Sequence, residues 1–385
     1  MSLVKAPDNL LIPTAKIDLD HIRNKQIHLF IIGHGQVGSL LVDQLIEERE
    51  NLQRKRRIDL SIVAIANSTT VLFDPNGIGA DWKERKIQSG KPYTIPELIE
   101  GAHNYGLYNT VMVDNTASPS FVLNYLPFIE AGFSLVSSNK VANTLSMEFY
   151  DNLRERLAKR QQDYLYETNV GAGLPLIDTI KLLHLSGENI TRIRGVFSGS
   201  LSYIFNRYSQ EDLPFHKVLQ SAIQKGYTEP DPREDLSGND VARKLLILAR
   251  ELALQCEFDE VQIENLIPDE LRALSTKEFL EDLQALDAHF NTVKSCCQQN
   301  EVLRYVATLD GNLADDYGAR MQVRLEAVPK DSMLGQLKGS DSIFEIFTES
   351  YGGHPIVIQG AGAGPKVTAR GVFGDILRIS ERVSA

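Results

Sequence analysis

The sequence predicts an α/β protein built on a doubly wound parallel sheet, with an α+β domain inserted before the last helix. One observation is a glycine-rich turn that joins an apolar strand to a helix near the start of the chain. Another is the alternation of short apolar strands with amphipathic helices after that turn, which is typical of parallel sheets covered by helices on both faces. A second glycine-rich turn near the end predicts that the last helix returns to the first domain.

Length and composition describe an ordinary globular chain. Its 385 residues suffice for two or three domains, and 43% of them are hydrophobic. The formal net charge of −11 gives no indication of a nucleic-acid or anionic-membrane partner. No segment reaches about eighteen uninterrupted apolar residues, and three cysteines fit a reducing compartment, so we expect a cytoplasmic protein. The one basic run, 54–57, is expected in a solvated turn.

The first glycine turn has the order of a dinucleotide site. The apolar run Ile27 to Ile32 reads as a buried strand, the sequence Gly-His-Gly-Gln-Val-Gly follows it, and Ser39 to Glu50 has helical spacing. In such a site the first glycine allows the tight turn, the second lets a pyrophosphate approach, and the third packs helix on strand. The alternative is a purely structural turn. The Rossmann-type interpretation makes these residues candidate cofactor contacts: Gly33, Gly35, Gln36, Val37 and Gly38.

The residues after the second strand leave the choice of cofactor open. The strand Leu60 to Ala66 runs into Asn67-Ser68-Thr69-Thr70. This segment has no carboxylate for the ribose of NAD and no arginine for the phosphate of NADP. We expect NADP or NAD, with a slight preference for NADP.

Two further strands end in polar residues. Residues 110–113 lead into Asp114-Asn115-Thr116, and 133–136 lead into Ser137-Ser138-Asn139-Lys140. Ligands of open α/β sheets lie at the carboxyl ends of strands, so Thr116 and Lys140 are candidate site residues. The alternative for Lys140 is a solvated loop lysine. Between these strands, 119–130 reads as a helix with Ser118 as its N-cap.

A third polar turn follows a strand predicted over 164–168. In the segment 167–175, Gly171 and Gly173 permit backbone angles that turn several carbonyl groups towards one point. Such carbonyls beside Glu167 would suit a monovalent cation, and the alternative is a strand-to-helix turn without an ion. Helices are then expected from 198 to 281. Strands are expected at 300–310, 319–328 and 355–359, and a helix at 366–379.

The most informative segment is 226–244. It places several carboxylates in a loop stiffened by Pro230 and Pro232, and then opens a helix. Asp240 and Lys244 lie four residues apart and therefore on one face of that helix. An acidic loop beside an acid–base pair suits a small cationic substrate that gains or loses a proton. The alternative is a solvated loop before a surface helix.

Taken in order, these motifs resemble those of homoserine dehydrogenases. The resemblance extends over about 27–380 and is strongest to the dehydrogenase half of bifunctional aspartokinase–homoserine dehydrogenase. No aspartokinase region precedes residue 27 and no ACT domain is apparent after the last helix. Whether the chain is free-standing or part of a longer bifunctional protein stays open.

The resemblance implies reversible, NAD(P)-dependent reduction of L-aspartate 4-semialdehyde to L-homoserine, on the route to threonine and methionine. It implies that Lys244 transfers the proton and that Asp240 orients Lys244 or tunes its pKa. Glu229 and Asp235 would hold the substrate's ammonium and hydroxyl groups. Lys140 would lie near both the nicotinamide and the substrate.

Other implications of the resemblance concern the cofactor, an ion and assembly. Thr116 and Gly362 would contact the cofactor. A sodium ion would be bound mainly by backbone oxygens of Glu167, Val170, Ala172 and Leu174. Residues 20–165 and 360–385 would form the dinucleotide-binding domain, and 166–359 the substrate-binding domain through which a homodimer or higher homo-oligomer forms.

Two rival classes of function are weighed. The first is another amino-acid-linked dehydrogenase on the same fold, such as aspartate-semialdehyde dehydrogenase or aspartate dehydrogenase. Aspartate-semialdehyde dehydrogenase needs a cysteine nucleophile, whereas Cys256, Cys296 and Cys297 lie late in the chain without a nucleophile-like setting. A non-catalytic nucleotide-sensing module would not need both Asp240 and Lys244. Both rivals are therefore disfavoured.

Overall fold

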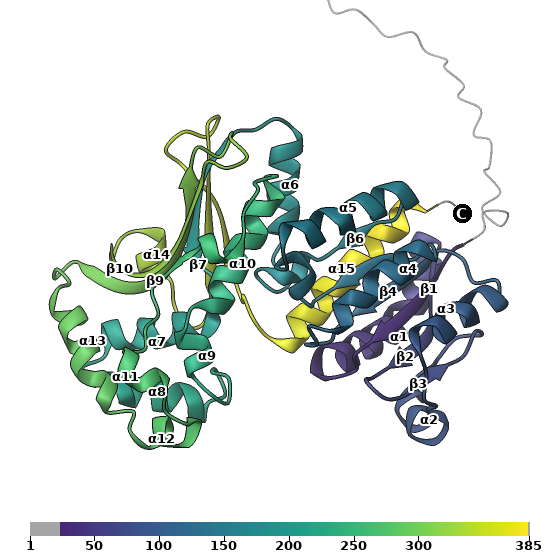
Figure 1. Ribbon diagram of the computed structural model, residues 1–385, viewed down its shortest axis with the longest axis horizontal. Coiled ribbons are helices and arrows are strands. Elements are labelled where there is room, and N and C mark those ends of the chain that lie inside the picture. The colour runs from purple at the N-terminus through teal and green to yellow at the C-terminus, as the bar shows by residue number, and fades with distance from the viewer. Residues whose placement is uncertain (1–23, 384–385) are drawn as a thin grey trace, which may run out of the picture.

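The computed structural model describes residues 24–383 and contains two six-stranded sheets side by side (Figure 1). The first unit comprises the first sheet with helices α1 to α5 and α15, and the second unit comprises the second sheet with helices α6 to α14. Of the expected first domain, residues 20–23 and 384–385 lie outside the described residues. No helix between residues 24 and 383 is both long enough and apolar enough to cross a membrane.

The first sheet has the predicted doubly wound arrangement. Its strand order is β3-β2-β1-β4-β5-β6, and all neighbours are parallel except the antiparallel pair β2 and β3. The order reverses between β1 and β4, which is where ligands bind in such sheets. The strands are β1 Lys25–Ile32, β2 Ile58–Ala66, β3 Val71–Phe73, β4 Thr110–Asp114, β5 Ser134–Ser137 and β6 Tyr164–Leu165.

Helices cover both faces of the first sheet. On β1, Leu29 and Ile31 belong to a core shared with α1 and α15, whereas Phe30 and Ile32 face a core that includes α3, α4 and α5. The last helix therefore returns to pack against α1, as the second glycine turn predicts. The helices are α1 Gln36–Arg56, α2 Trp82–Ser89, α3 Ile95–Asn104, α4 Tyr125–Glu130, α5 Met147–Arg160 and α15 Pro365–Arg382.

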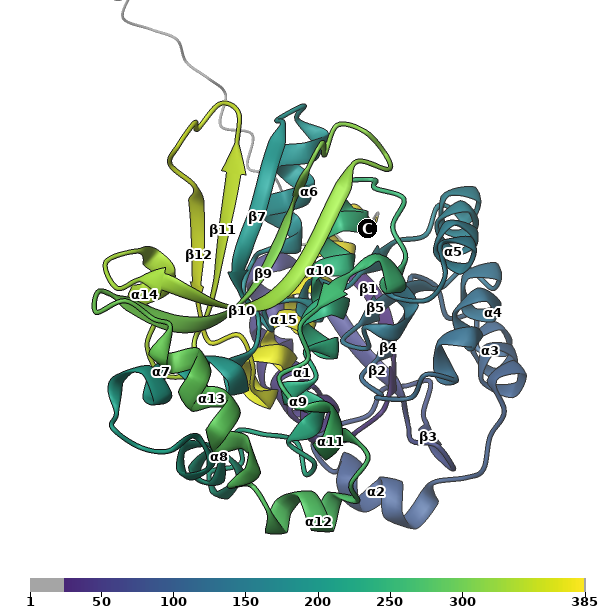
Figure 2. The ribbon, with the colours of Figure 1, turned by 60° about the vertical axis from the view of Figure 1, so that its left-hand side comes forward.

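The second sheet is mixed, in the order β12-β11-β7-β9-β10-β8, with only β8 and β10 parallel. Its strands are β7 Ile190–Val196, β8 Gln262–Ile263, β9 Glu301–Gly311, β10 Ala319–Pro329, β11 Ser342–Thr348 and β12 Ile356–Gly360. Figure 2 shows its long strands with α7, α8 and α13 gathered below them. The helices are α6 Ile177–Leu185, α7 Gly199–Gln210, α8 Phe215–Gln224, α9 Arg233–Leu236, α10 Asn239–Glu251, α11 Asp269–Arg272, α12 Thr276–Glu281, α13 Ala285–Ser295 and α14 Met333–Gln336.

Most predicted elements agree with the structure within a few residues, and four expectations need correction. The strands β3, β8 and β11 were not expected; β8 lies inside 198–281, where helices are expected, and β11 lies between β12 and β7. The strand expected over 164–168 ends at Leu165 and is followed by the 3-10 turn Glu167–Asn169. The helix expected from 119 starts as the 3-10 turn Phe121–Asn124, whose first N–H donates to Ser118 Oγ at 3.2 Å. Most of the basic run 54–57 forms the last turn of α1, where cations favour the carbonyl end of a helix.

The glycine turn after β1 has the steric roles that its sequence predicts. Gly33 has φ +87°, and a Cβ there would lie 2.8 Å from the carbonyl carbon of Asn115. A Cβ added at Gly38 would overlap the carbonyl oxygen of Gly33. Gly35 precedes α1 and has no atom within 4 Å of its Cβ position, so space for a ligand remains open there.

We predict that Gly38→Ala destabilises the protein by about 3 kcal/mol, because the added methyl group overlaps backbone that cannot move aside. Gly374→Ala is the matched control, since Gly374 lies inside α15 with no atom within 4 Å of its Cβ position. It should stabilise the protein by about 0.5–1 kcal/mol. Urea unfolding measures both, and equal effects of the two substitutions would contradict the packing described for the turn.

Candidate active site

A cavity of about 560 Å³ lies between the two units. Its volume is in the range of small-molecule sites, which run from about 300 to 1,000 Å³. Residues from the glycine turn, the strand ends, the acidic loop and α10 all line it. The predicted site residues in its walls are Val37, Lys140, Ala172, Glu229, Asp235, Asp240, Lys244 and Gly362.

Asp240 bridges two lysines at the start of α10. Its Oδ2 lies 2.8 Å from Lys244 Nζ, as the four-residue spacing predicts. Its Oδ1 lies 3.3 Å from Lys140 Nζ, a contact across the two units that the sequence does not predict. Lys244 Nζ also donates to the carbonyl oxygen of Phe197 at 3.0 Å. An ammonium group has three N–H donors, so one donor of Lys244 remains for a ligand in the cavity.

The charges around Asp240 keep it ionised. Burial alone would raise the pKa of its carboxyl group, but the charges of Lys244 and Lys140 outweigh that effect and hold the pKa well below its usual range. The Lys244 side chain is only 12% exposed. A fixed carboxylate and a carbonyl therefore hold a largely buried ammonium group at the cavity wall.

The acidic loop presents Glu229 beside these cations. Burial, together with the neighbouring Asp235, raises the pKa of Glu229. Asp235 Oδ2 accepts a hydrogen bond from Glu229 N at 2.9 Å, and its Oδ1 accepts one from Ser200 Oγ at 2.6 Å. Asp235 thus braces the loop as well as lining the cavity, and the brace is a role that its position in the sequence does not reveal.

Asp231 of the acidic loop is hydrogen-bonded to the start of α12. Asp231 pairs with Arg233 at 2.6 Å and accepts a hydrogen bond from Thr276 Oγ1 at 2.8 Å. The hydrogen bond from Arg233 lowers the pKa of Asp231 to about 2. These contacts hold the loop in place, so its carboxylates divide between anchoring the loop and facing the cavity.

Several residues in the cavity wall are not predicted from the sequence, and two of them, Ser198 and Thr168, have polar groups that bear on ligand binding. Ser198 caps α7 by accepting a hydrogen bond from Leu201 N at 3.3 Å, which directs the N-terminus of this helix at the cavity. Helix N-termini bind anions, and a serine directly before the helical run was the available signal. Thr168 also lines the cavity, and its buried Oγ1 has no partner among the described residues.

The other predicted cofactor contacts surround the glycine turn. A Cβ on Gly33 would lie 2.9 Å from Thr116 Cγ2, so Thr116 lies beside the turn although it does not line the cavity. Thr116 N donates to Asp114 Oδ1 at 2.7 Å. Gly362 is packed so closely against Ser342 that a Cβ would overlap the serine hydroxyl.

The structure brings a cation to the end of β2, where the sequence shows none. Lys86 on α2 is buried and donates to Thr70 Oγ1, and burial lowers the pKa of Lys86. A buried ammonium group is therefore held beside the ribose end of the predicted dinucleotide site.

His34 of the glycine turn lies edge-on to Trp82, with ring centroids 5.9 Å apart. The Nε2 atom of His34 is buried without a hydrogen-bond partner in residues 24–383.

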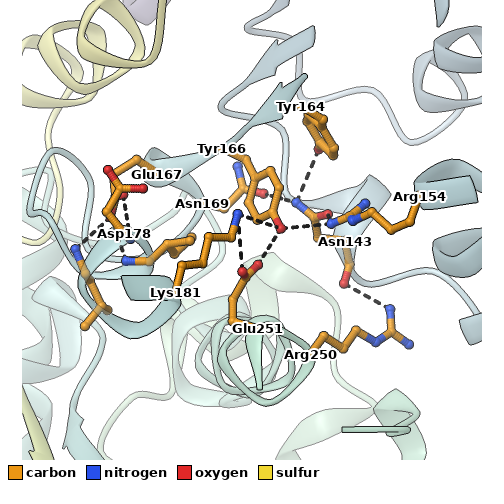
Figure 3. Close-up of polar contacts among 12 residues, drawn as sticks. Asn143, Arg154, Tyr164, Tyr166, Glu167, Asn169, Asp178, Lys181, Arg250 and Glu251 are labelled. Carbon is orange, nitrogen blue, oxygen red and sulfur yellow. Dashed lines mark hydrogen bonds and ion pairs between the residues drawn. The ribbon is translucent and has the colours of Figure 1, made fainter. Parts of the chain in front are cut away.

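The expected cation loop is only partly arranged as predicted. The Glu167 carboxylate caps α6, because Oε1 accepts from Leu176 N and Ile177 N, both at 2.7 Å, and Oε2 from Asp178 N at 2.9 Å. Figure 3 shows Glu167 against this helix end. Burial, with Asp178 nearby, raises the pKa of Glu167 to about 8. The Glu167 side chain is thus committed to α6.

The loop backbone still leaves carbonyl oxygens available. Gly171 and Ala172 have φ of +77° and +53°, the left-handed turn that the glycines predict. Within residues 24–383 the carbonyl oxygens of Val170 and Ala172 accept no hydrogen bond, whereas Leu174 O accepts one from Leu176 N at 2.9 Å. No cluster of three or more His, Cys, Asp or Glu side chains suited to a metal occurs among these residues.

A dinucleotide turn that opens on a lysine–carboxylate pair defines the class of this protein as an NAD(P)-dependent oxidoreductase. Residues 33–167 match the family model described as the NAD binding domain of homoserine dehydrogenase, and residues 175–377 match the homoserine dehydrogenase model. The chain belongs to the homoserine dehydrogenase family.

Similar proteins include both bifunctional and single-function enzymes. A Buchnera aphidicola bifunctional aspartokinase/homoserine dehydrogenase is 38% identical over 98% of this chain and 46% of its own length. The chain thus spans about half the length of such relatives or less. A homoserine dehydrogenase of Paracoccidioides brasiliensis is 36% identical, and the match covers 93% of this chain and 99% of that protein.

Solved structures show the same fold. A Candida auris protein of unknown function superposes with a TM-score of 0.84 at 34% identity, covering 94% of this chain and 99% of that one. A homoserine dehydrogenase from a hyperthermophilic archaeon, in complex with NADPH, superposes with a TM-score of 0.69 at 22% identity. That match covers 93% of this chain and 99% of the archaeal one.

We predict that Lys244→Ala lowers NAD(P)-dependent dehydrogenase turnover by about 10²–10⁴-fold, because it removes the ammonium group that we expect to transfer the proton. Cofactor affinity, measured by quenching of Trp82 fluorescence, should stay within about twofold, since Lys244 belongs to the other unit. Lys277→Ala is the control, because Lys277 forms an exposed i,i+4 pair with Glu281 at 3.9 Å. A Lys244→Ala enzyme with near wild-type turnover would remove this lysine from the chemistry.

Proposed function

We propose that the chain catalyses the reversible NAD(P)-dependent reduction of L-aspartate 4-semialdehyde to L-homoserine, a step shared by threonine and methionine biosynthesis. The observation that carries this proposal is the Lys244 ammonium group, held by Asp240 and the Phe197 carbonyl. It lies in the wall of a cavity that the glycine turn also lines through Val37. The family membership supports the same reaction.

The residues divide the chemistry between proton transfer and orientation. The bound nicotinamide cofactor supplies the hydride that reduces the aldehyde carbon. Lys244 donates a proton to the developing alkoxide and takes it back in the reverse direction. Asp240 fixes the direction of the Lys244 ammonium group, and its negative charge offsets the repulsion between Lys244 and Lys140.

The substrate is a zwitterion, so it needs contacts of both signs. Glu229 offers a carboxylate to the substrate's ammonium group. Because burial and Asp235 raise the pKa of Glu229, a cationic group placed beside it would stabilise its ionised form. Lys140 and the N-terminus of α7 at Ser198 offer positive charge to the substrate's carboxylate. Asp235 contacts the substrate's hydroxyl group, for which each of its oxygens retains a second lone pair.

The two rivals fit the cavity less well. Aspartate-semialdehyde dehydrogenase chemistry needs a thiolate, yet Cys256, Cys296 and Cys297 are absent from the cavity walls. Burial raises the pKa of Cys256 to about 11, which opposes thiolate formation. A non-catalytic nucleotide-binding module would have no use for a lysine fixed by two partners in the cavity.

Initial rates with homoserine, using NADP and NAD in turn at alkaline pH, test the proposal. We expect homoserine-dependent reduction of the cofactor, without any requirement for phosphate. Well-folded protein that turns over neither cofactor would instead support the nucleotide-binding module. Turnover that depends on aspartate semialdehyde and phosphate would support the semialdehyde dehydrogenase.

We further propose that NADP is the preferred cofactor. Lys86 supports this preference, because it places a buried ammonium group against Thr70, directly after the strand whose end lies at the adenosine ribose in this fold. The 2′-phosphate of NADP would give that cation an ionic partner.

Lys86→Met should therefore raise KM for NADP about tenfold, equivalent to about 1.4 kcal/mol, and leave KM for NAD within about twofold. Lys83→Met is the matched control, because Lys83 lies on the same helix but pairs with Asp43 at 3.0 Å. Steady-state kinetics with both cofactors measure the effect. Equal changes for NADP and NAD would assign Lys86 a purely structural role.

We also propose a sodium ion at the loop formed by Glu167, Val170, Ala172 and Leu174. The free carbonyl oxygens of Val170 and Ala172 support it, since oxygen ligands suit a hard cation. With its side chain bound to α6, Glu167 would contribute its backbone oxygen. Equal turnover and equal thermal stability in sodium and tetramethylammonium buffers would exclude the ion.

The second unit is proposed as the substrate-binding and dimerisation domain, spanning 166–359, with 20–165 and 360–385 as the dinucleotide-binding domain. Support for assembly comes from the edge strand β12, where Val357 is 36% exposed. The buried Nε of Arg192 on β7 also has no hydrogen-bond partner in residues 24–383, although its guanidinium group packs on the Phe347 ring. Light scattering should give at least twice the mass of one chain. A single-chain mass at micromolar concentration would reject the homodimer.

We propose a cytoplasmic location, because the three cysteines fit a reducing compartment. All three cysteines are free thiols, and Cys296 is exposed, which suits a reducing compartment. A fluorescent fusion followed by fractionation tests the location, and recovery outside the cytoplasm would overturn it.

A further inference from the structure

A buried guanidinium group joins the end of α10 to the first unit. Arg250 is 3% exposed and lies in the last turn of α10. Its Nη1 donates to the carbonyl oxygens of Asn143 at 3.0 Å and Leu145 at 2.7 Å. Nε and Nη2 donate to Cys256 O at 3.2 and 2.9 Å, and Nη2 lies 3.1 Å from a carboxylate oxygen of Glu257. All five N–H donors of Arg250 are therefore used.

The acceptor Asn143 belongs to the segment that begins with Lys140. Lys140 precedes the 3-10 turn Val141–Asn143, so the active-site lysine and the Arg250 acceptors lie on one short segment of the first unit. Asn143 is 1% exposed, and its amide donates to Asn169 Oδ1 at 2.9 Å. Asn169 in turn lines the cavity. A displacement of Asn143 would thus be transmitted to both Lys140 and the cavity wall.

Helix α10 contacts this segment at both of its ends. Asp240 in its first turn pairs with Lys140, and Arg250, ten residues later, bonds to Asn143 and Leu145. Ten residues of α-helix span about 15 Å. Two contacts at that separation fix the helix against translation and rotation relative to 140–145 far better than either contact alone.

A second buried cluster reinforces the same end of α10. Glu251 accepts a hydrogen bond from Tyr166 OH and lies 3.3 Å from Lys181 Nζ. Arg154 Nη2 donates to Tyr166 OH at 2.9 Å and to Asn143 Oδ1 at 2.8 Å. Figure 3 shows these groups converging on Tyr166 and Asn143 from α5, α6 and α10. Both units therefore contribute charged groups to one buried network.

We propose that Arg250 is a positioning residue that sets Asp240 and Lys244 against Lys140 and the cofactor. A guanidinium group buried without acceptors is strongly unfavourable, so the arrangement of the units that supplies the carbonyls of Asn143 and Leu145 is selected over others. The geometry of the site then depends on a residue that does not line the cavity. This proposal rests on the proposed function, because it assumes that Lys244 transfers the proton.

Arg250→Lys tests the proposal, since lysine keeps the charge but its three N–H donors cannot replace the five hydrogen bonds that Arg250 makes to four acceptors. We expect kcat to fall about tenfold and KM for NADP to stay within about twofold. Arg304→Lys is the matched control: Arg304 is 0% exposed and donates to backbone carbonyls of Leu303, Leu334, Gly335 and Leu337, all within the second unit. Arg250→Lys and Arg304→Lys should lower Tm by similar amounts, whereas kcat of Arg304→Lys should stay within about twofold of the wild-type value.

A double-mutant cycle separates positioning from general loss of structure. If Arg250 acts through Asp240, then Arg250→Lys in an Asp240→Asn background should lower kcat by less than about threefold. A full tenfold loss in that background, or an unchanged kcat in Arg250→Lys alone, would overturn the proposal. Should Arg250→Lys not fold, Arg250→Gln decides by the same criteria, because its amide offers two N–H donors in place of five and the expected loss in kcat is at least about fivefold.

The wild-type enzyme keeps the two proposals distinct. Wild-type protein without homoserine-dependent turnover would refute the proposed function itself. Active wild-type protein with unaffected Arg250→Lys kinetics would refute only the positioning role.

Discussion

The carboxylate of Asp240 is the contact on which the site depends. It lies 2.8 Å from one ammonium group and 3.3 Å from another, and those two cations come from different units of the chain. Without it, two like charges would face each other across the cavity, where a pair 4 Å apart costs about 4 kcal/mol at an effective dielectric constant of 20. With it, both lysines have fixed directions. The same carboxylate thus fixes the ammonium group that we propose as the proton donor, and it joins the two halves of the site.

The fold explains why this contact forms. The segment beginning at Lys140 leaves the carboxyl end of β5, next to the point where the strand order of the first sheet reverses. Helix α10 brings Asp240 and Lys244 from the second unit, and Gly238, with φ +77°, makes the turn that starts this helix. Tyr305 OH lies so close to Gly238 that any side chain there would collide with it. Neither unit alone contains a complete site.

What the sequence predicts well is local. The glycine turn at 33–38 and the i,i+4 pair of Asp240 and Lys244 depend on backbone geometry over a few residues, and both form as expected. The pairing of Lys140 with Asp240, and of Asn143 with Arg250, joins residues about a hundred positions apart, and no local pattern encodes such contacts. The contact of Lys86 with Thr70 at the end of β2 joins α2 to a strand end, and the residues that follow the strand do not reveal it either.

Two local features that the sequence does not reveal concern Glu167 and β11. Helix α6 begins at Leu176-Ile177 without a side-chain cap of its own, so the Glu167 carboxylate caps it from nine residues upstream. Strand β11, which the sequence analysis does not predict, has the sequence Ser-Ile-Phe-Glu-Ile-Phe-Thr with one charged residue at its centre. In the sheet, that charge, Glu345, lies directly opposite Arg194 of β7, and this cross-strand pairing is invisible in either segment alone.

The most direct test of the account is the pH dependence of kcat/KM for homoserine oxidation by Lys244→Arg. Arginine retains the positive charge beside Asp240 but does not release its proton at any accessible pH. If Lys244 transfers the proton, this variant should bind homoserine yet show almost no oxidation anywhere between about pH 6 and about pH 10. Oxidation at near wild-type rates, with an unchanged pH profile, would show that positive charge suffices and that the proton leaves by another route.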